Sequence, residues 1–116
     1  MKDPRVFVEQ ILESIERING YIAQRSVEDF MAPGELQDAV IRRLEIIGEA
    51  ATKLPEAFKA QHPEVPWSQI SGMRNKLIHE YFGVDLGLTW RTVQKDLPEL
   101  ERQLGEILKE LESKGL

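Results

Sequence analysis

The stretch LQDAVIRRLEIIGEAATKL, residues 36–54, decides the fold class of this chain. Its apolar residues recur at steps of three and four, whereas charged residues such as Arg42 and Glu49 fall off that pattern. Because an α-helix turns by about 100° per residue, this spacing places the apolar side chains on one face. The stripe comprises Leu36, Val40, Leu44, Ile47, Ala51 and Leu54. The stretch therefore predicts one long amphipathic helix with a buried side.

The sequence before and after this stretch predicts further helices. Asp3 is placed to cap a helix that begins with Pro4, a residue that is well tolerated in a first helical turn. The apolar face of that helix comprises Phe7, Ile11, Ile15, Ile18 and Ile22. We expect a short helical turn capped by Ser26 before Pro33-Gly34, and another turn between Pro55 and Gln61.

In the C-terminal half we expect a third long helix from Trp67 to Tyr81, and a short one that starts at Asp85. The core stripe of the third helix comprises Ile70, Met73, Leu77 and Tyr81. Asp96 is expected to cap the last helix, with Pro98 in its first turn. Its apolar face comprises Leu97, Leu100, Leu104, Leu108 and Leu111.

Strand signals are almost absent, since no alternation of apolar and polar residues is sustained. We therefore predict an all-α protein, an antiparallel four-helix bundle with additional short helices, in one domain over residues 1–116.

Composition narrows the possible functions. Of the 116 residues, 41% are hydrophobic and 30% are charged, and the formal charge is -5. A protein that grips long nucleic acid usually has a basic surface, so we expect any contact with nucleic acid to be local. The chain has no cysteine, which excludes thiol catalysis and zinc bound by cysteine. No segment approaches the roughly 18 apolar residues of a membrane span, and no signal peptide is visible, so we expect a cytoplasmic protein.

The stretch RNKLIHEYF, residues 74–82, carries the candidate chemistry. On a straight helix Arg74 and Tyr81 would lie within roughly 20° of each other, and Asn75 would share the face of His79. His79 would lie about 140° around the helix from Arg74. For these two residues to act together, either the helix ends or distorts near His79, or a two-fold axis brings two copies together.

These side chains suit the cleavage of RNA without a metal. Histidine exchanges a proton near neutral pH, and the planar guanidinium of arginine matches phosphate oxygens. Asparagine can orient a substrate, and a phenol can donate a hydrogen bond or act as a nucleophile. The 2′-hydroxyl of RNA supplies the nucleophile for attack on its own phosphate. From the residues alone a structural interpretation stays open, in which His79 and Tyr81 pack at a helix end and Arg74 is a surface charge.

At these residues the chain resembles a known family. The run PWSQISGMRNKLIHEYFGVD, residues 66–85, resembles the characteristic segment of the HepT-like branch of the HEPN domains. Arg74, His79 and Tyr81 meet its pattern R-x-x-x-x-H-x-Y. The stretches RRLEIIGEAATKLP, residues 42–55, and KDLPELERQL, residues 95–104, resemble the same branch in the same order.

The resemblance implies an all-α homodimer with the motif at a cleft between subunits. It implies a metal-independent ribonuclease, without a cofactor, that acts as the toxin of a toxin–antitoxin pair. Arg74 would bind and stabilise the phosphate, His79 would be the general acid or base, and Asn75 would be a polar helper. The partner would be a small nucleotidyltransferase antitoxin, which in some pairs silences the toxin by transferring AMP to the motif tyrosine, here Tyr81.

Two other functions stay open. One is a dimeric binding module that holds a nucleotide or the nucleotidyltransferase in the same cleft and cuts nothing. The acidic charge favours it, because an RNA enzyme gains from a basic approach surface. The other is a purely structural helical dimer.

Residues outside the motif are more simply structural. We expect His62 at the surface, and Arg42 in surface pairs with Glu45 or Glu49. Core packing or a dimer interface is the expected use of Trp67 and Trp90.

Overall fold

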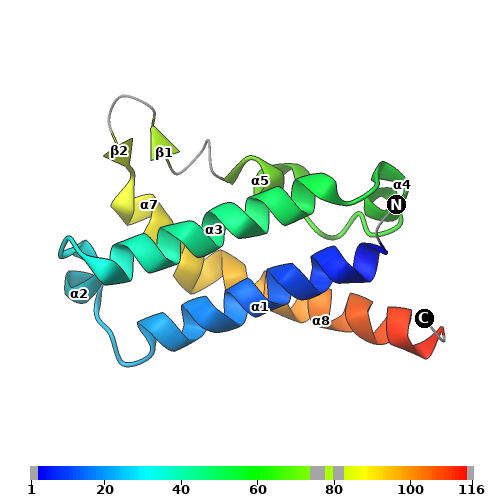
Figure 1. Cartoon of the computed structure of the whole chain (residues 1–116), viewed down its shortest axis with the longest axis horizontal. Helices are drawn as coiled ribbons and strands as arrows, with labels where there is room; N and C mark the ends of the chain where they lie inside the picture. The colour runs from blue at the N-terminus through cyan, green and yellow to red at the C-terminus, as the bar shows by residue number, and fades with distance from the viewer. Residues whose placement is uncertain (1–2, 74–77, 80–82, 115–116) are drawn as a thin grey trace.

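The structure, a computed structural model, describes residues 3–73, 78–79 and 83–114. Three long helices dominate this part of the chain: α1 (Pro4–Ile22), α3 (Glu35–Lys53) and α8 (Leu97–Ser113). Helix α1 packs against both of the others and runs antiparallel to them (Figure 1). The all-α class predicted from the sequence is confirmed.

Short elements connect the long helices. Helix α2 (Val27–Met31) precedes α3, and α4 (Glu56–Ala60) and α5 (Trp67–Ser71) follow it. Two strands of two residues each come next, β1 (Ile78–His79) and β2 (Gly83–Val84). Helix α7 (Leu86–Arg91) and the π-helix η1 (Thr92–Asp96) then lead into α8.

Three of the predicted helix starts are confirmed by their hydrogen bonds. The Asp3 side chain accepts from the Arg5 N–H at 2.9 Å, with Pro4 in the first turn of α1. Ser26 forms a full capping box at the start of α2. The Asp85 side chain accepts from the Leu88 N–H at 3.0 Å and so caps α7. Each of these starts depends only on residues a few positions apart.

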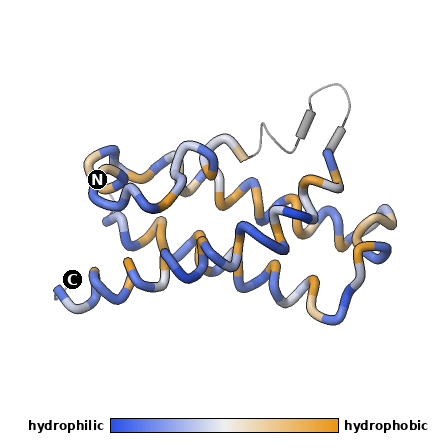
Figure 2. Tube along the Cα trace, turned by 180° about the vertical axis from the view of Figure 1, so that it is seen from behind, coloured by the Kyte–Doolittle hydropathy of each residue, from blue (hydrophilic) through white to orange (hydrophobic). Residues whose placement is uncertain are grey.

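The apolar stripes of the long helices meet in one core, and Figure 2 shows hydrophobic residues recurring along each of them. The stripe of α3 is buried from Val40 to Leu54, and Leu36 is half-buried. In α8 the fully buried residue of the third turn is Ile107, whereas Leu108 and Leu111 are only half-buried. The predicted buried face of α8 is therefore right in the first half of the helix. In the second half the buried face is centred one residue earlier than predicted, at Ile107 instead of Leu108.

The predicted helix over Trp67–Tyr81 is wrong at Ile78 and His79, which are extended. Helix α5 ends at Ser71, and Ile78 and His79 form β1, which pairs antiparallel with β2. Ile78 faces Val84 across the ladder, and β-branched residues favour extended backbone. Of the expected core stripe, Ile70 and Met73 are buried, whereas Leu77 and Tyr81 lie outside the described residues.

The predicted cap at Asp96 is also wrong. Its backbone is helical, with φ -84° and ψ -38°, and its side chain makes no capping hydrogen bond. A cap residue needs non-helical backbone, but here η1 carries the chain from α7 into α8 without a break. Pro98 nevertheless lies in the first turn of α8, as predicted.

Candidate active site

The chain enters the motif from α5, which is firmly held against the core. Trp67 is buried, and its indole N–H donates to the His62 carbonyl at 2.9 Å. Ile70 is buried, and α5 packs against α3 at Gly48, where an added Cβ would lie 3.3 Å from the Ile70 carbonyl oxygen. Met73, directly before Arg74, is 7% exposed. The core therefore fixes the chain up to the residue before the motif arginine.

The chain leaves the motif through α7, which is held as firmly. The buried Thr89 hydroxyl donates to the Asp85 carbonyl at 2.7 Å, next to the cap that Asp85 itself provides. The ring of Trp90 lies 5.2 Å from that of Phe30, which ties α7 to α2. The helices on both sides of the motif stretch are thus anchored to the rest of the bundle.

His79 lies on extended backbone between these ends, opposite Gly83. In Figure 1 the two strands stand out from the helices, above α7 and the first half of α3. The backbone at His79 is therefore no longer helical. This is the first of the two conditions named above under which Arg74 and His79 could act together, namely that the helix ends or distorts near His79. The geometric reason for a dimer required a helix through His79 and no longer holds.

The four predicted site residues lie wholly or in part outside the described residues. Arg74, Asn75 and Tyr81 lie outside the described residues, and so does the side chain of His79. The interpretation of Arg74 and His79 as the catalytic pair, of Asn75 as the positioning residue and of Tyr81 as a modification target stays a prediction.

His62 is less exposed than the surface position expected from the sequence, because the residue is half-buried. Its side chain is 14% exposed, its ring lies 4.9 Å from that of Phe58, and its Nδ1 lies 3.8 Å from a Glu64 carboxylate oxygen. Sequence reasoning missed this burial because it comes from tertiary packing. The connection after α4 folds back over Phe58 and is tied down by the indole of Trp67.

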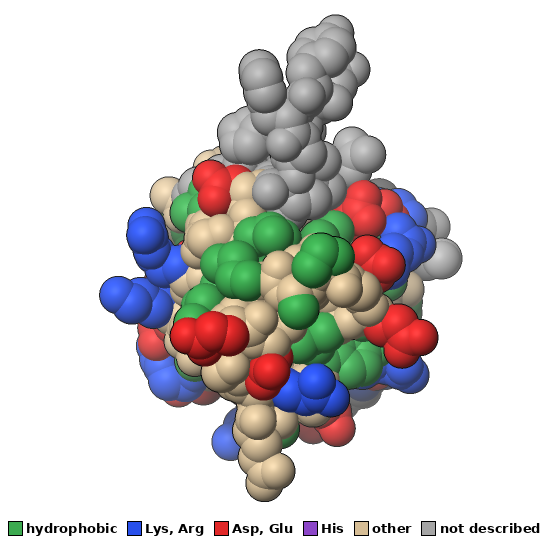
Figure 3. All heavy atoms as spheres, turned by 90° about the vertical axis from the view of Figure 1, so that its left-hand side faces the viewer, with side chains coloured by type: hydrophobic (Ala, Val, Ile, Leu, Met, Phe, Trp, Pro, Cys, Tyr) green, Lys and Arg blue, Asp and Glu red, His purple; other side chains and the backbone are tan. Residues whose placement is uncertain are grey.

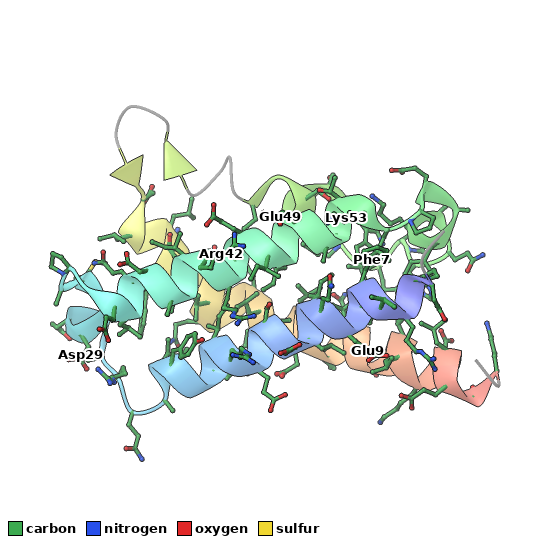
Figure 4. The ribbon with its side chains drawn as sticks, viewed as in Figure 1. Phe7, Glu9, Asp29, Arg42, Glu49 and Lys53 are labelled. Atoms are coloured by element: carbon green, nitrogen blue, oxygen red, sulfur yellow. The ribbon has the colours of Figure 1, made fainter. Side chains whose placement is uncertain are left out.

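Of the two uses expected for the tryptophans, core packing is confirmed for Trp67, which is buried and contacts Phe58. Trp90 is half-buried and contacts Phe30. The expected surface pairing of Arg42 is confirmed for Glu49, with 3.9 Å between the guanidinium and the carboxylate. Figure 4 shows both side chains on α3, and each is more than half exposed.

The described residues contain neither a metal-binding cluster nor a membrane-spanning helix. No group of three or more His, Cys, Asp or Glu side chains in this part of the chain is arranged to hold a metal ion. Within the same residues, no helix is both long and apolar enough to cross a membrane.

Comparison with known proteins identifies the class. The family described as "Ribonuclease HepT-like" matches residues 11–107, a range that includes the whole motif stretch. The chain belongs to this family of ribonucleases, which confirms the resemblance seen in the sequence.

Individual relatives agree with the family match. "Putative RNase TTE0752" of Caldanaerobacter subterraneus is 49% identical over 108 residues, which cover 93% of this chain and 96% of the relative. "Probable ribonuclease HepT" of Thermococcus cleftensis is 46% identical over 103 residues, or 89% of this chain and 94% of the relative.

A third relative is longer than this chain. "Gamma-glutamylcyclotransferase and putative RNase MJ0434" of Methanocaldococcus jannaschii is 48% identical over 111 residues, which cover 96% of this chain and 50% of the relative. The chain thus spans half the length of that protein. No solved structure matches the chain significantly.

Proposed function

We propose that this chain is a metal-independent endoribonuclease and the toxin of a toxin–antitoxin pair. The observation that carries the proposal is the motif of Arg74, His79 and Tyr81 inside a chain that belongs to a ribonuclease family. The anchored ends of the motif stretch support it, because catalysis needs reacting groups held in place by a rigid scaffold.

The proposed reaction is transesterification within RNA. The 2′-hydroxyl attacks the adjacent phosphorus, the bond from phosphorus to the 5′-oxygen breaks, and a 2′,3′-cyclic phosphate and a 5′-hydroxyl result. His79 either accepts the proton of the 2′-hydroxyl or donates a proton to the leaving oxygen. Arg74 stabilises the negative charge that grows on the phosphate oxygens, and Asn75 orients the substrate.

The proposed control is covalent modification by a nucleotidyltransferase antitoxin. The Tyr81 hydroxyl would attack the α-phosphorus of a nucleoside triphosphate held by the antitoxin, form a tyrosyl-AMP ester and release pyrophosphate. The added phosphate would place bulk and negative charge beside Arg74 and His79 and so exclude RNA.

The proposed assembly is a homodimer with the motif at a cleft between subunits. Two exposed hydrophobic side chains support it, Val27 and Met31, each 38% exposed on α2. Figure 3 shows hydrophobic side chains gathered at the end of the bundle that carries α2. An exposed apolar patch of this kind is typical of a protein–protein interface.

The deciding experiment is RNA cleavage in EDTA by the wild type and by His79→Ala, with analysis of the product ends. We expect cyclic-phosphate ends from the wild type and a loss of at least 100-fold in rate for the variant. Equal cleavage by the variant would remove His79 from the mechanism. If neither protein cleaves, the intact mass of the wild type will show whether Tyr81 already carries AMP.

A second candidate is the non-catalytic binding module. The formal charge of -5 favours it, because an acidic surface slows the approach of RNA. Calorimetric titration with nucleotides tests it, and binding without any RNA cleavage at high protein concentration would support it over the enzyme.

A further inference from the structure

A pocket of about 290 Å³ lies between α1 and α3, which run side by side and antiparallel (Figure 1). Gln10, Glu13 and Ser14 line it from α1. The lining residues of α3 recur at steps of three and four, from Arg43 to Lys53, and so share one face of that helix. Pockets for drug-sized molecules have about 300–1,000 Å³, so this pocket, here termed the α1–α3 pocket, suits a ligand at the small end of that range.

The α1–α3 pocket contains a buried hydroxyl without a partner. Ser14 is 0% exposed, and its Oγ makes no hydrogen bond with any described residue. Three threonines in described helices differ from it, since Thr52, Thr89 and Thr92 each donate to the carbonyl oxygen four residues earlier. That local bond satisfies a hydroxyl within a helix. Because Ser14 lacks it, a ligand oxygen that accepts from this hydroxyl would remove the cost of leaving it unpaired.

Two cations line the α1–α3 pocket and form no ion pair within the described residues. They are Arg43, which is half-buried, and Lys53, which is exposed. A half-buried guanidinium has lost part of its hydration, and an anion with a matching pair of oxygens would replace it. The two residues are ten positions apart on α3, or about 15 Å along the helix axis, so positive charge is present at both ends of the pocket.

The two carboxylates that line the pocket already have partners. Glu13 lies 3.2 Å from Arg17, and Glu49 lies 3.9 Å from Arg42. Among the described residues, those that line the pocket and their ion-pair partners comprise four cations and two carboxylates. The formal charge of the whole chain is -5. The α1–α3 pocket is therefore a locally positive site on an acidic protein.

The charge and the unpaired hydroxyl favour a phosphate group on a small molecule. A phosphate carries close to two negative charges and three oxygens that accept hydrogen bonds, so it can satisfy a hydroxyl and a guanidinium together. A carboxylate has only two oxygens in one plane. A long RNA strand fits less well, because the exposed carboxylates beside the pocket and the net charge of the chain repel a polyanion.

We propose that the α1–α3 pocket binds the phosphate group of a small molecule. The Arg43 guanidinium pairs with two phosphate oxygens, the Ser14 hydroxyl donates to a third, and Lys53 supplies the second positive charge. The proposal goes beyond the proposed ribonuclease activity and does not rest on it, because binding in this pocket is measurable on protein that cleaves nothing.

The test uses AMP and inorganic phosphate as probes, with succinate as the carboxylate comparison, in a buffer free of phosphate. Amide chemical shifts of the isotope-labelled protein report where each probe binds. We expect AMP to shift the amides of Ser14, Ile46 and Ala50 with a dissociation constant below about 1 mM. Inorganic phosphate should shift the same amides, and tighter binding of AMP would identify a nucleotide as the source of the phosphate.

Matched charge variants make the test specific. Arg43→Gln should weaken AMP binding at least tenfold, because hydrogen bonds between charged groups are among the strongest in proteins. Arg25→Gln removes the same charge at an exposed position outside the pocket and should weaken binding less than threefold. Circular dichroism checks that both variants fold.

Ser14→Ala separates a contact to the ligand from a purely structural role. Alanine removes the hydroxyl and favours the helix more than serine does, so the melting temperature of the free protein should not fall. AMP should bind at least threefold more weakly, and the rise in melting temperature that AMP causes should shrink. A clear fall in the melting temperature of the free variant would show that the hydroxyl already has a partner inside the protein, against the proposal.

Four further results would overturn the proposal. AMP could shift amides around His79 and leave those of the pocket unchanged. Arg43→Gln and Arg25→Gln could weaken binding equally, which would indicate attraction to the net charge alone. Succinate could bind as tightly as phosphate. A single-stranded oligonucleotide could displace AMP from the pocket, which would assign it to RNA. None of these readouts involves RNA cleavage, so failure here leaves the test of the ribonuclease proposal intact.

Discussion

Asp85 stands where the motif stretch returns to the helical core, so its cap has consequences for the site. Its side chain accepts from the Leu88 N–H at 3.0 Å, and its carbonyl accepts from the Thr89 hydroxyl at 2.7 Å. Asp85→Ala removes only the side-chain bond, and we expect a loss of about 1 kcal/mol in the free energy of unfolding. Asp85→Asn keeps an acceptor and should stay within about 0.3 kcal/mol of the wild type. Urea unfolding of both variants measures the difference, and equal losses would show that charge and not the cap matters.

Residue types predicted some local features of this chain well and others poorly. The caps at Asp3, Ser26 and Asp85 follow from short-range chemistry, since each side chain bonds an N–H two or three residues on. Asp96 is a residue type equally suited to cap α8, but a cap forms only at the first turn of a helix. Here η1 continues directly into α8, so Asp96 lies within helical backbone. The burial of His62 has no local signal at all, because Phe58 and Trp67 create it.

At the scale of elements, α3 and α5 approach closely because residue 48 has no side chain. A Cβ at Gly48 would lie 3.3 Å from the Ile70 carbonyl oxygen, whereas a Cβ at Gly105 in α8 would have no atom outside its own helix within 4 Å. Gly105→Ala should therefore stabilise the protein by about 0.5–1 kcal/mol through helix propensity alone. Gly48→Ala gains the same propensity but must displace α5, and we expect a net loss of about 1 kcal/mol.

Thermal unfolding of both variants measures these changes, and cleavage assays extend the comparison. Because α5 leads directly to Met73 and Arg74, displacement of α5 should also lower RNA cleavage by Gly48→Ala, while Gly105→Ala leaves it unchanged. If Gly48→Ala is as stable as Gly105→Ala, then α5 adjusts without cost and does not hold the motif in place.

The elements themselves were predictable where a single periodicity ran far enough. The stripe from Val40 to Leu54 fixes α3 because one helical face recurs over many turns. Between Trp67 and Tyr81 the stripe Ile70, Met73, Leu77 and Tyr81 has the same spacing, yet Ile78 and His79 are extended. The antiparallel pairing of Ile78 with Val84 outweighs the helical pattern there, and such pairing between separate segments is invisible to a periodicity. The same limit hid the hydrogen bond from the Gln103 side chain to the Glu64 carbonyl, which joins segments more than thirty residues apart.

For the whole molecule, the large exposed hydrophobic side chains among the described residues divide between its two ends. Val27 and Met31 lie at the end that carries α2, and Val6 lies near the N-terminus at the other end (Figure 1). If the proposed dimer forms through the α2 end, burying an aspartate there would cost several kcal/mol. Met31→Asp should therefore dissociate the dimer, whereas Val6→Asp, at 40% exposure, should leave it intact.

Light scattering coupled to size exclusion measures this prediction directly, and both substitutions are at exposed positions where the monomer fold should tolerate them. We expect Met31→Asp to halve the mass from that of a dimer, and to lower RNA cleavage at least tenfold if the site lies between subunits. A monomeric wild type would end the dimer proposal. Dissociation by Val6→Asp alone would move the interface to the other end of the bundle, away from the strands that carry His79. Measuring both the molecular mass and the rate of RNA cleavage of Met31→Asp distinguishes two kinds of dimer. If dissociation lowers cleavage, the active site needs both subunits, whereas unchanged cleavage by the monomer would show that each subunit carries a complete site.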